Sequence, residues 1–301
     1  MKPKLNKKIS LVIPAKQGAK LSVLDNINQS DFEVIVETGN NTSRNRNNGI
    51  KKAKTELVAF TNAHTVLKPD WLTQVEKFFK KHPEIDIVGG PQLNYSKEKF
   101  FARTSGYALS SLFGACIMSK RYSQGKLTLN ADETIVTSAN LICKKEVFKK
   151  VKFDENIYPG EDPKFISDAK SAGFKIAYTP EIVVYNLRRN SFSELFKQIF
   201  NYGRVRPKKE SIFETIKRPY FLGPTLFLVY LLILPTLSII SRYFLAPGLI
   251  YLILNLVFSI YESTRNKEFK SAFVLPFIFL TIHLSYGLGF LVGLVEKCKT
   301  K

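Results

Sequence analysis

Three long apolar runs near the end of the chain constrain its fold more than any other feature. They cover residues 221–241, 245–263 and 272–295. A helix that crosses a bilayer needs about 20 mostly apolar residues, and only a helix or a closed barrel satisfies its own backbone groups in lipid. The alternative is a set of buried core helices, but three such runs in succession leave little polar surface. We therefore predict a transmembrane region with about three helices over residues 219–301.

Basic residues beside these runs predict how the region is oriented. Before the first run and between the second and third they are frequent, whereas the loop after the first run carries only Arg242. The two groups are Arg204, Arg206, Lys208, Lys209, Lys217 and Arg218, and then Arg265, Lys267 and Lys270. Because Lys and Arg collect on the cytoplasmic side, we predict an integral membrane protein with a cytoplasmic N-terminal domain. Three full spans would place Lys297, Lys299 and Lys301 on the other side, against this rule. Either one run is a re-entrant or interfacial segment, or the basic tail is an exception to the rule, and the sequence leaves both alternatives open.

The formal net charge of +20 predicts an anionic partner. No helix-turn-helix, zinc-finger or RNA-binding aromatic motif is present, so we expect membrane lipids and no nucleic acid. Basic residues beside a membrane are attracted to anionic headgroups. The three cysteines are odd in number and lack the spacing of zinc ligands, which predicts reduced thiols in a reducing compartment.

Residues 1–190 read as alternating strands and helices. Short apolar strands are predicted at residues 9–14, 32–37, 57–61 and 85–88, with helices at 42–53 and 70–81. Strands that alternate with helices predict an α/β domain with a mostly parallel sheet covered on both faces. In such sheets, ligands bind beyond the carboxyl ends of the strands. The third strand ends at Asn62 and His64, which marks that position as a candidate ligand site.

The segment between the domain and the apolar runs has its own pattern. Phe192, Leu195, Phe196 and Ile199 follow helical spacing over residues 191–204, and Ser191 with Glu194 forms a capping-box pattern. An amphipathic helix at the membrane surface fits this pattern, and so does a helix packed on the soluble domain. We assign residues 191–218 to an interfacial helix and a basic linker.

Several stretches of the first 190 residues, in order, resemble glycosyltransferase family 2, whose members are inverting enzymes with the GT-A nucleotide-diphospho-sugar transferase fold. They are LVIPAK at 11–16, SRNRNNGI at 43–50, VAFTNAHT at 58–65, KPDWL at 68–72, TSANL at 137–141 and GEDPKF at 160–165. The His of TNAHT and the ending HLSYGLGF at 283–290 are similar to a membrane-anchored subgroup related to succinoglycan-synthesis glucosyltransferases. The resemblance implies a Rossmann-like GT-A domain followed by the transmembrane helices.

The stretch Asn62-Ala63-His64 matches the place where the family carries Asp-x-Asp, or Asp-x-His in the subgroup. The resemblance implies that Asn62 and Ala63 contact the nucleotide sugar and that His64, with Asn62, holds a Mn²⁺ or Mg²⁺ ion. Such an ion stabilises the charge on the departing diphosphate as a Lewis acid. Asn62 brings a neutral oxygen in place of a carboxylate, so the alternative is a strand end that has lost its metal.

The pair Glu161-Asp162 matches the acidic pair of the family at the start of a helix. The resemblance implies that both belong to the catalytic site and that Asp162 is the general base. It would take a proton from the acceptor hydroxyl while that oxygen attacks the anomeric carbon from the opposite face. The alternative is a pair of acids that favours a helix N-terminus through its dipole.

The resemblance also assigns the nucleotide-binding side. Pro14 and Ala15 end the first strand, and Glu37 lies where the family has an acid that contacts the base. Arg44 and Arg46 could pair with phosphates, or they could lie on a solvated helix face. The connection after Glu37 is shorter than in the family, which leaves the nucleotide open; we expect a UDP-sugar.

On the acceptor side, the resemblance points to Asn140. Gln198, Tyr202 and Arg204 lie where processive relatives carry Gln-x-x-Arg-Trp, but here the spacing differs and the Trp is missing. This difference favours the transfer of a single sugar over polysaccharide chain extension.

The sequence therefore predicts a membrane-anchored, metal-assisted glycosyltransferase of the hexosyltransferase type. It would move a sugar from a nucleotide-diphosphate donor to a lipid-linked or glycan acceptor at the cytoplasmic face, in polysaccharide or glycolipid biosynthesis. The alternative is a catalytically weakened relative that serves as an assembly partner in a glycan-synthesis complex.

Overall fold

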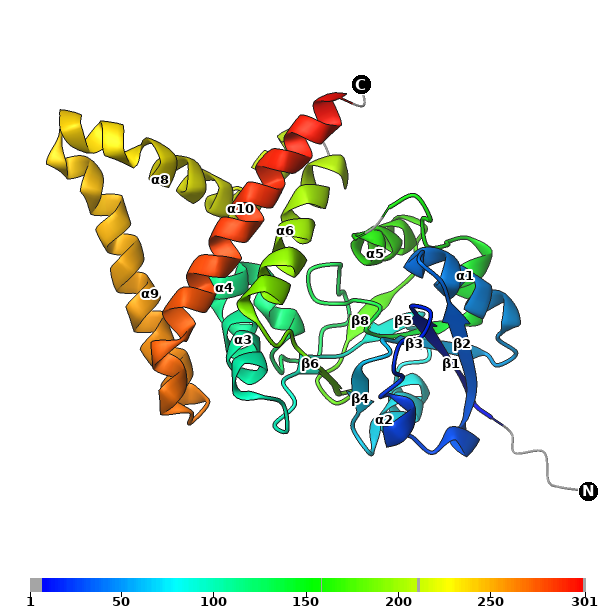
Figure 1. The fold of residues 1–301 in the computed structure, drawn as a ribbon. Coiled ribbons are helices and arrows are strands. Elements are labelled where there is room, and N and C mark those ends of the chain that lie inside the picture. Colours follow the sequence, from blue (N-terminus) through cyan, green and yellow to red (C-terminus); the bar gives the residue numbers. More distant parts are fainter. Residues whose placement is uncertain (1–6, 158, 210–211, 300–301) are drawn as a thin grey trace, which may run out of the picture. The chain divides into compact units, whose positions relative to one another are not determined.

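The computed structural model describes residues 7–157, 159–209 and 212–299, and its contacts divide the chain into two units (Figure 1). The first unit contains the chain up to Tyr95 together with Lys120–Leu187. The second contains Ser96–Ser119 together with the chain from Arg188 onward. The second unit is therefore built from two stretches of sequence, with part of the first unit between them.

A six-stranded sheet with the order β2-β1-β3-β7-β5-β8 forms the centre of the first unit. Its strands are β1 (Ile9–Ala15), β2 (Phe32–Thr38), β3 (Leu57–Thr61), β5 (Ile87–Gly89), β7 (Asn140–Lys144) and β8 (Ile176–Tyr178). The strand β7 runs antiparallel to both neighbours, and the other five are parallel to one another. A small second sheet has the order β4-β9-β6, with β4 (Thr65–Leu67), β6 (Gln92–Leu93) and β9 (Val184–Asn186). The predicted α/β fold with a mostly parallel sheet is confirmed.

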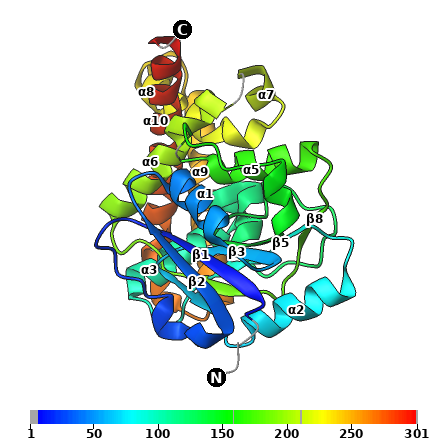
Figure 2. The ribbon, with the colours of Figure 1, turned by 90° about the vertical axis from the view of Figure 1, so that its right-hand side faces the viewer.

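Helices cover both faces of the large sheet because its strands are apolar on both sides. On one face, Val12 and Phe60 pack with Phe165 and Ile166 of α5 (Glu161–Ser171), and Ile50 of α1 (Thr42–Lys52) packs against this cluster. On the other face, β-strand residues pack with Trp71, Val75 and Phe78 of α2 (Trp71–Lys81). Figure 2 shows α1 and α2 beside the strands from a second direction. The sheet is thus a buried middle layer, as the apolar strands predicted.

The predicted elements lie close to the observed ones. The helices predicted at 42–53 and 70–81 correspond to α1 and α2, and the first three strands correspond to β1, β2 and β3. The fourth strand begins at Ile87 instead of residue 85, because the N–H of Ile85 donates to the carbonyl of His82 in the turn after α2. The strands β7 and β8, and the small second sheet, were not predicted.

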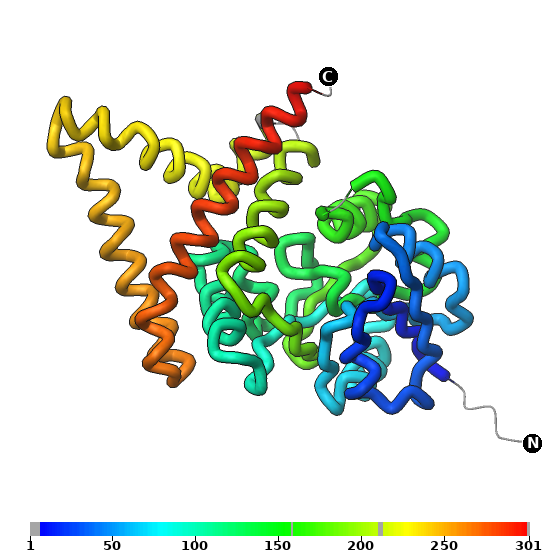
Figure 3. The backbone as a smooth tube through the Cα atoms, viewed as in Figure 1, coloured from blue at the N-terminus to red at the C-terminus, as the bar shows by residue number. Residues whose placement is uncertain are grey.

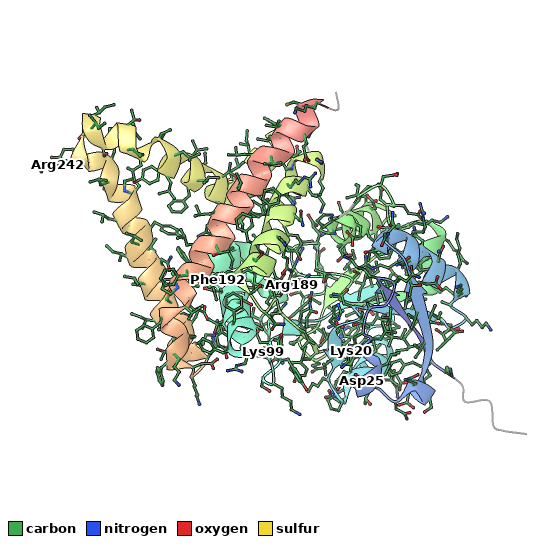
Figure 4. The ribbon with its side chains drawn as sticks, in the orientation of Figure 1. Lys20, Asp25, Lys99, Arg189, Phe192 and Arg242 are labelled. Carbon is green, nitrogen blue, oxygen red and sulfur yellow. The ribbon has the colours of Figure 1, made fainter. Side chains whose placement is uncertain are left out.

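The second unit consists mainly of helices. Their bounds are α3 (Phe100–Ser110), α4 (Leu112–Ala115), α6 (Phe192–Lys209), α7 (Ile212–Ile216), α8 (Gly223–Ile240), α9 (Ala246–Arg265) and α10 (Leu275–Lys299). In the part of the chain that the structure describes, three helices are long and apolar enough to cross a membrane: residues 223–240, 242–265 and 275–299. Figure 4 shows Arg242 at the turn where α8 leads into α9. The predicted set of three apolar helices is confirmed in length and composition.

The helix α6 begins where the capping box predicted. The Ser191 hydroxyl accepts from the N–H of Glu194 at 3.3 Å, and the Glu194 carboxylate accepts from the N–H of Asn190 at 3.0 Å. The first bond satisfies a backbone donor that the first helical turn leaves unpaired, and the second ties the Glu194 carboxylate to the residue before Ser191. The helix continues to Lys209, five residues beyond the predicted end at 204, and it packs against α10 within the second unit.

The early stretch of the second unit packs among the apolar helices. The ring of Phe113, in α4, stacks on Phe258 of α9 with centroids 5.2 Å apart and meets Phe279 of α10 edge-on at 5.1 Å. Its carbonyl oxygen lies 2.8 Å from Nε2 of His283. A segment near residue 100 is therefore part of the same core as helices that follow it by more than a hundred residues.

Candidate active site

Polar ends of several strands meet at one edge of the large sheet. The strand β3 ends at Thr61, which pairs with Asn140, the first residue of the antiparallel β7. Because β7 runs in the opposite direction, its beginning lies at the edge where β3 ends. The Thr61 hydroxyl also donates to the carbonyl of Ala139 at 3.3 Å. The stretches Thr61-Asn62 and Ser138-Asn140 are therefore neighbours, as expected for a ligand site at the carboxyl edge of the parallel strands.

Asp162 joins this edge through two polar contacts. The Ser138 hydroxyl donates to its carboxylate oxygen Oδ1 at 2.5 Å, and Nη1 of Arg46 lies 3.3 Å from the same atom. The side chain of Asp162 is 23% exposed, so it remains accessible to a substrate while its position is fixed. A fixed and accessible carboxylate beside a ligand edge can accept a proton from a bound hydroxyl group.

Glu161 lies deeper than Asp162 and has a different environment. Its side chain is 7% exposed, Nη1 of Arg46 donates to its Oε1 at 2.8 Å, and its Oε2 accepts from the N–H of Gly160 at 2.8 Å. Gly160 has φ of +124°, a conformation that favours glycine, and it precedes the first turn of α5. The arrangement makes Glu161 an anchor for Arg46 and for the start of the helix. Its predicted membership of the catalytic site stays a prediction.

Arg46 is buried and links the two carboxylates. Its side chain is 3% exposed, and its guanidinium lies over the ring of Phe153 with 5.1 Å to the centroid. Its pairing with Glu161 and Asp162 connects α1 to α5. The interpretation of Arg46 as a residue on a solvated helix face is therefore wrong. Its predicted pairing with phosphates stays a prediction, and its observed partners are carboxylates.

Helix α1 brings the other nucleotide-side residues to the ends of β1 and β2. Ala15, the last residue of β1, pairs with Thr38 in the sheet register, and Pro14 pairs with Glu37. The carbonyl of Ala15 accepts from the N–H of Gly39 at 3.0 Å and from the Asn45 amide at 3.2 Å. Pro14 and Ala15 are buried, so their backbone and the turn that follows shape this corner.

Glu37 and Arg44 each form an ion pair with a side chain of opposite charge. Nζ of Lys52 donates to the Glu37 carboxylate at 2.6 Å, and the Glu37 side chain is 11% exposed. Arg44 is 64% exposed and donates from Nε to Glu155 at 3.0 Å. A hydrogen bond from Asn47 and the charge of Arg44 hold the pKa of Glu155 below its ordinary value. Arg44 is thus an accessible cation at this corner, as a phosphate contact requires.

Asn62, Ala63 and His64 form the turn between β3 and β4. The carbonyl of Asn62 accepts from the N–H of Thr65 at 3.1 Å, which closes the turn. Ala63 is buried, and its carbonyl accepts from the N–H of Val23 at 3.2 Å. Asn62 is half-buried and His64 is exposed. The turn therefore presents an amide and an imidazole at the edge that also carries Asp162.

Asn140 is a structural residue of this edge. It is 1% exposed; its Oδ1 accepts from Nε1 of Trp71 at 3.0 Å, and its Nδ2 donates to the carbonyl of Ile182 at 2.7 Å. These bonds fix the loop that leads to Ser138, so an acceptor-side role of Asn140 would act through the shape of that loop. The role itself stays a prediction.

Comparison with known proteins decides the family. The family model described as glycosyltransferase-like family 2 matches residues 8–201, more than half of the 301-residue chain. The chain belongs to glycosyltransferase family 2. The family-2 domain supports a nucleotide-sugar glycosyltransferase, which takes a nucleotide-sugar donor and an acceptor, and the GT-A-like fold predicted from the sequence is confirmed.

Two solved structures match part of the chain at low sequence identity. The crystal structure of S. aureus TarS is 14% identical with a TM-score of 0.39, and the match covers 65% of this chain and 39% of that one. The crystal structure of A197 from STIV is 15% identical with a TM-score of 0.39, and the match covers 61% of this chain and 95% of that one. No curated protein matches the chain.

Members of family 2 commonly use a divalent cation, which requires side chains that can act as metal ligands. The turn offers Asn62 and His64, both neutral, where hard cations such as Mg²⁺ prefer carboxylate oxygens. Among residues 7–157, 159–209 and 212–299, no group of three or more His, Cys, Asp or Glu side chains is arranged to hold a metal ion. Asn62 and His64 alone therefore do not form a binding site for such a cation.

The remaining predicted acceptor-side residues lie on α6, in the second unit. Gln198 donates from its amide to the Tyr202 hydroxyl at 3.0 Å, and Arg204 pairs with Glu296 of α10. The site described above gathers Asp162, Glu161 and Arg46 in the first unit, whereas Gln198, Tyr202 and Arg204 belong to the second unit. Their acceptor-side role stays a prediction.

Sequence reasoning missed Ser138, although it lies in the family-like stretch at 137–141. The signal for it is a hydroxyl residue two positions before a buried strand at the carboxyl edge of the sheet. Only the contact with Asp162 reveals its role, because the two residues are 24 positions apart in the chain.

Proposed function

We propose that this chain is a membrane-anchored, inverting glycosyltransferase with Asp162 as its general base. It transfers a single sugar from a nucleotide-diphosphate donor, with a UDP-sugar as the expected donor, to a lipid-linked or glycan acceptor at the cytoplasmic membrane face. The observation that supports this proposal most is the accessible carboxylate of Asp162, held by Ser138 and Arg46 at the carboxyl edge of the sheet.

The proposed step is a single displacement. The acceptor hydroxyl oxygen attacks the anomeric carbon of the donor, and Asp162 takes the proton from that hydroxyl. The bond between the anomeric carbon and the diphosphate oxygen breaks, and the nucleoside diphosphate leaves with the electron pair. Because attack and departure occur on opposite faces, the configuration at the anomeric carbon is inverted.

The turn at Asn62–His64 and the corner at Arg44 would bind the donor. The Asn62 amide and the His64 imidazole can donate hydrogen bonds to diphosphate oxygens, and Arg44 can pair with a phosphate charge. Glu37 and the backbone after Ala15 would contact the nucleoside. A Mn²⁺ or Mg²⁺ ion would be held by His64 and Asn62 only together with oxygens of the donor diphosphate.

The second candidate is a catalytically weakened relative that acts as an assembly partner in a glycan-synthesis complex. The neutral Asn62, in place of the acid of the family, favours it. The donor-binding experiment below separates the two functions.

Isothermal titration of the detergent-solubilised full chain with UDP- and GDP-sugars, with and without Mn²⁺, tests the proposed function. We expect binding of one nucleotide class, and His64→Ala should weaken it. The absence of nucleotide binding under every condition would contradict the enzyme proposal and favour the assembly partner. A mass-spectrometric donor screen with native membrane lipids as acceptors would then identify the sugar.

A further inference from the structure

Helices α6 and α10 lie side by side and point in the same direction (Figure 3). Small residues let their backbones touch: a Cβ added at Gly289 would lie 2.1 Å from the carbonyl oxygen of Phe200, and one at Gly293 would lie 2.0 Å from that of Arg204. The residue numbers of the contacting positions increase together along both helices, from Phe200 opposite Gly289 to Arg204 opposite Gly293. The pair is therefore parallel, with the closely spaced glycines that membrane helix pairs use.

Ion pairs join the C-terminal ends of the two helices. The Glu296 carboxylate of α10 pairs with Arg204 at 2.6 Å and with Lys208 at 2.6 Å. Nζ of Lys297 donates to the carbonyl of Pro207 at 2.5 Å. The end of α10 thus lies level with the basic end of α6, so both ends must be on the same side of a membrane.

The path of the chain conflicts with three crossings. If α8 and α9 both cross, α8 leaves the side on which α6 ends, α9 returns to it, and α10 begins there. If α10 crossed as well, its end would lie on the side opposite to the end of α6. The ion pairs between these two ends require them to lie on the same side, so three crossings contradict the observed contacts.

A crossing by α6 itself would remove the contradiction, but its composition excludes it. The helix carries charged side chains along its length, and each is costly at the centre of a bilayer. They are Glu194, Lys197, Arg204, Arg206, Lys208 and Lys209. In the described part of the chain, α6 is not one of the helices apolar enough to span a membrane.

The start of α8 gives a second, independent argument. A Cβ added at Gly287 would lie 2.5 Å from the carbonyl oxygen of Pro224, so α8 begins beside the middle of α10. Gly287 follows Leu275 by 12 residues, or about 18 Å of helix, which is more than half of a hydrocarbon core about 30 Å thick. A crossing α10 would therefore draw Lys217 and Arg218, just before α8, towards the bilayer centre.

The burial of the three apolar helices also separates α10 from the other two. In the most apolar 18-residue stretch of each helix, 6% of α8 and 11% of the α9 segment are buried within the protein, whereas 44% of α10 is buried. The side chains of α8 and α9 are thus left for lipid, and a large part of α10 packs on the chain itself.

We propose that only α8 and α9 cross the bilayer, and that α10 lies with α6 against the membrane surface on the side of the basic linker. The orientation rule is then satisfied, because Lys297 and Lys299 join Arg265, Lys270 and the other basic residues of that side. Lys301, the remaining basic residue of the tail, lies outside the described residues. The paired helices and these cations form a surface that fits an anionic leaflet.

Cysteine labelling in sealed vesicles tests this topology without reference to catalysis. The native chain has an exposed Cys298 at the end of α10 and a buried Cys143 in β7. A membrane-impermeant maleimide is added to vesicles of either orientation, and the labelled peptides are identified by mass spectrometry. Two further chains carry Arg242→Cys, at the turn between the crossing helices, and Lys270→Cys, on the side where α9 ends.

We expect Cys298 to be labelled from the same side as Lys270→Cys and from the side opposite to Arg242→Cys. Labelling of Cys298 from the side of Arg242→Cys would show a third crossing and overturn the proposal. Labelling of Cys298 only after detergent is added would place the end of α10 within the bilayer and would overturn it as well.

Discussion

Replacing Arg46 by Met removes the positive partner of two carboxylates at once. Arg46 and Glu161 are 3% and 7% exposed, so water cannot replace the lost contact. Breaking a buried pair by removing one partner costs about 3–5 kcal/mol, because the other charge is left uncompensated. At about 2–4 °C per kcal/mol, even the lower figure reduces the melting temperature of the first unit by about 6–12 °C.

The double variant Arg46→Met/Glu161→Met separates stability from catalysis. Replacing both members of a buried pair by apolar side chains is often neutral for stability, so we expect most of the loss in melting temperature to be recovered. Sugar transfer should stay about 100-fold below that of the native chain, since a misplacement of about 1 Å at a catalytic group has an effect of this size. Asp162 would retain Ser138 but lose the guanidinium that fixes it.

The chain contains its own probe for this measurement. Its single tryptophan, Trp71, is 2% exposed and lies in the first unit, so its fluorescence on heating reports the unfolding of that unit. Arg44→Met is the matched control on the same helix, because Arg44 is 64% exposed and such a pair contributes at most about 1 kcal/mol. The reasoning is refuted if Arg46→Met melts like the native chain, or if the double variant regains full transfer.

Two further predictions concern the second unit. Gly293→Ala should destabilise the α6–α10 pair by about 1–3 kcal/mol, because its methyl group would lie 2.0 Å from a backbone oxygen; Gly223→Ala, with nothing within 4 Å, is the control. The fraction that stays monodisperse on size exclusion after heating measures both, and equal behaviour would contradict the close packing. A hydrogen bond from Arg103 lowers the pKa of Glu268. This contribution to stability is present above the ordinary glutamate range near pH 4 and is lost as the pH falls through the lowered pKa. Glu268→Gln should therefore be less stable than the native chain at pH 7 and equal to it at low pH; a difference that persists in acid would be inconsistent with this origin.

Local patterns predicted what local physics determines. Strands with continuous apolar residues, the apolar runs and the Ser191 cap of α6 depend on neighbours a few residues away, and the structure has each of them. The small second sheet was missed because its strands are two or three residues long, too short for a period to appear.

The site residues show where local reasoning ends. Helix α1 has Ile50 as its single apolar side chain, so no apolar stripe indicates that Arg46 faces inward, and its partner Glu161 is 115 positions away. The pairing of α6 with α10 had a visible signal, since Gly289 and Gly293 have the spacing of a close helix contact. The partner of these glycines is α6, and its many charged residues give no sign of a close helix contact, so only the structure identifies it.

The transfer activity of Asp162→Asn tests the central claim most directly. Asp168→Asn is the matched control, because it is the same substitution on the same helix at a surface residue paired with Lys164. With the donor and acceptor found by the screen, we expect Asp162→Asn to bind the donor with native affinity and to lose transfer by at least about 100-fold, the contribution of a general base. We expect the native chain and Asp168→Asn alike to transfer the sugar with inverted configuration. Full transfer by Asp162→Asn, or retention of configuration in the native product, would contradict the account.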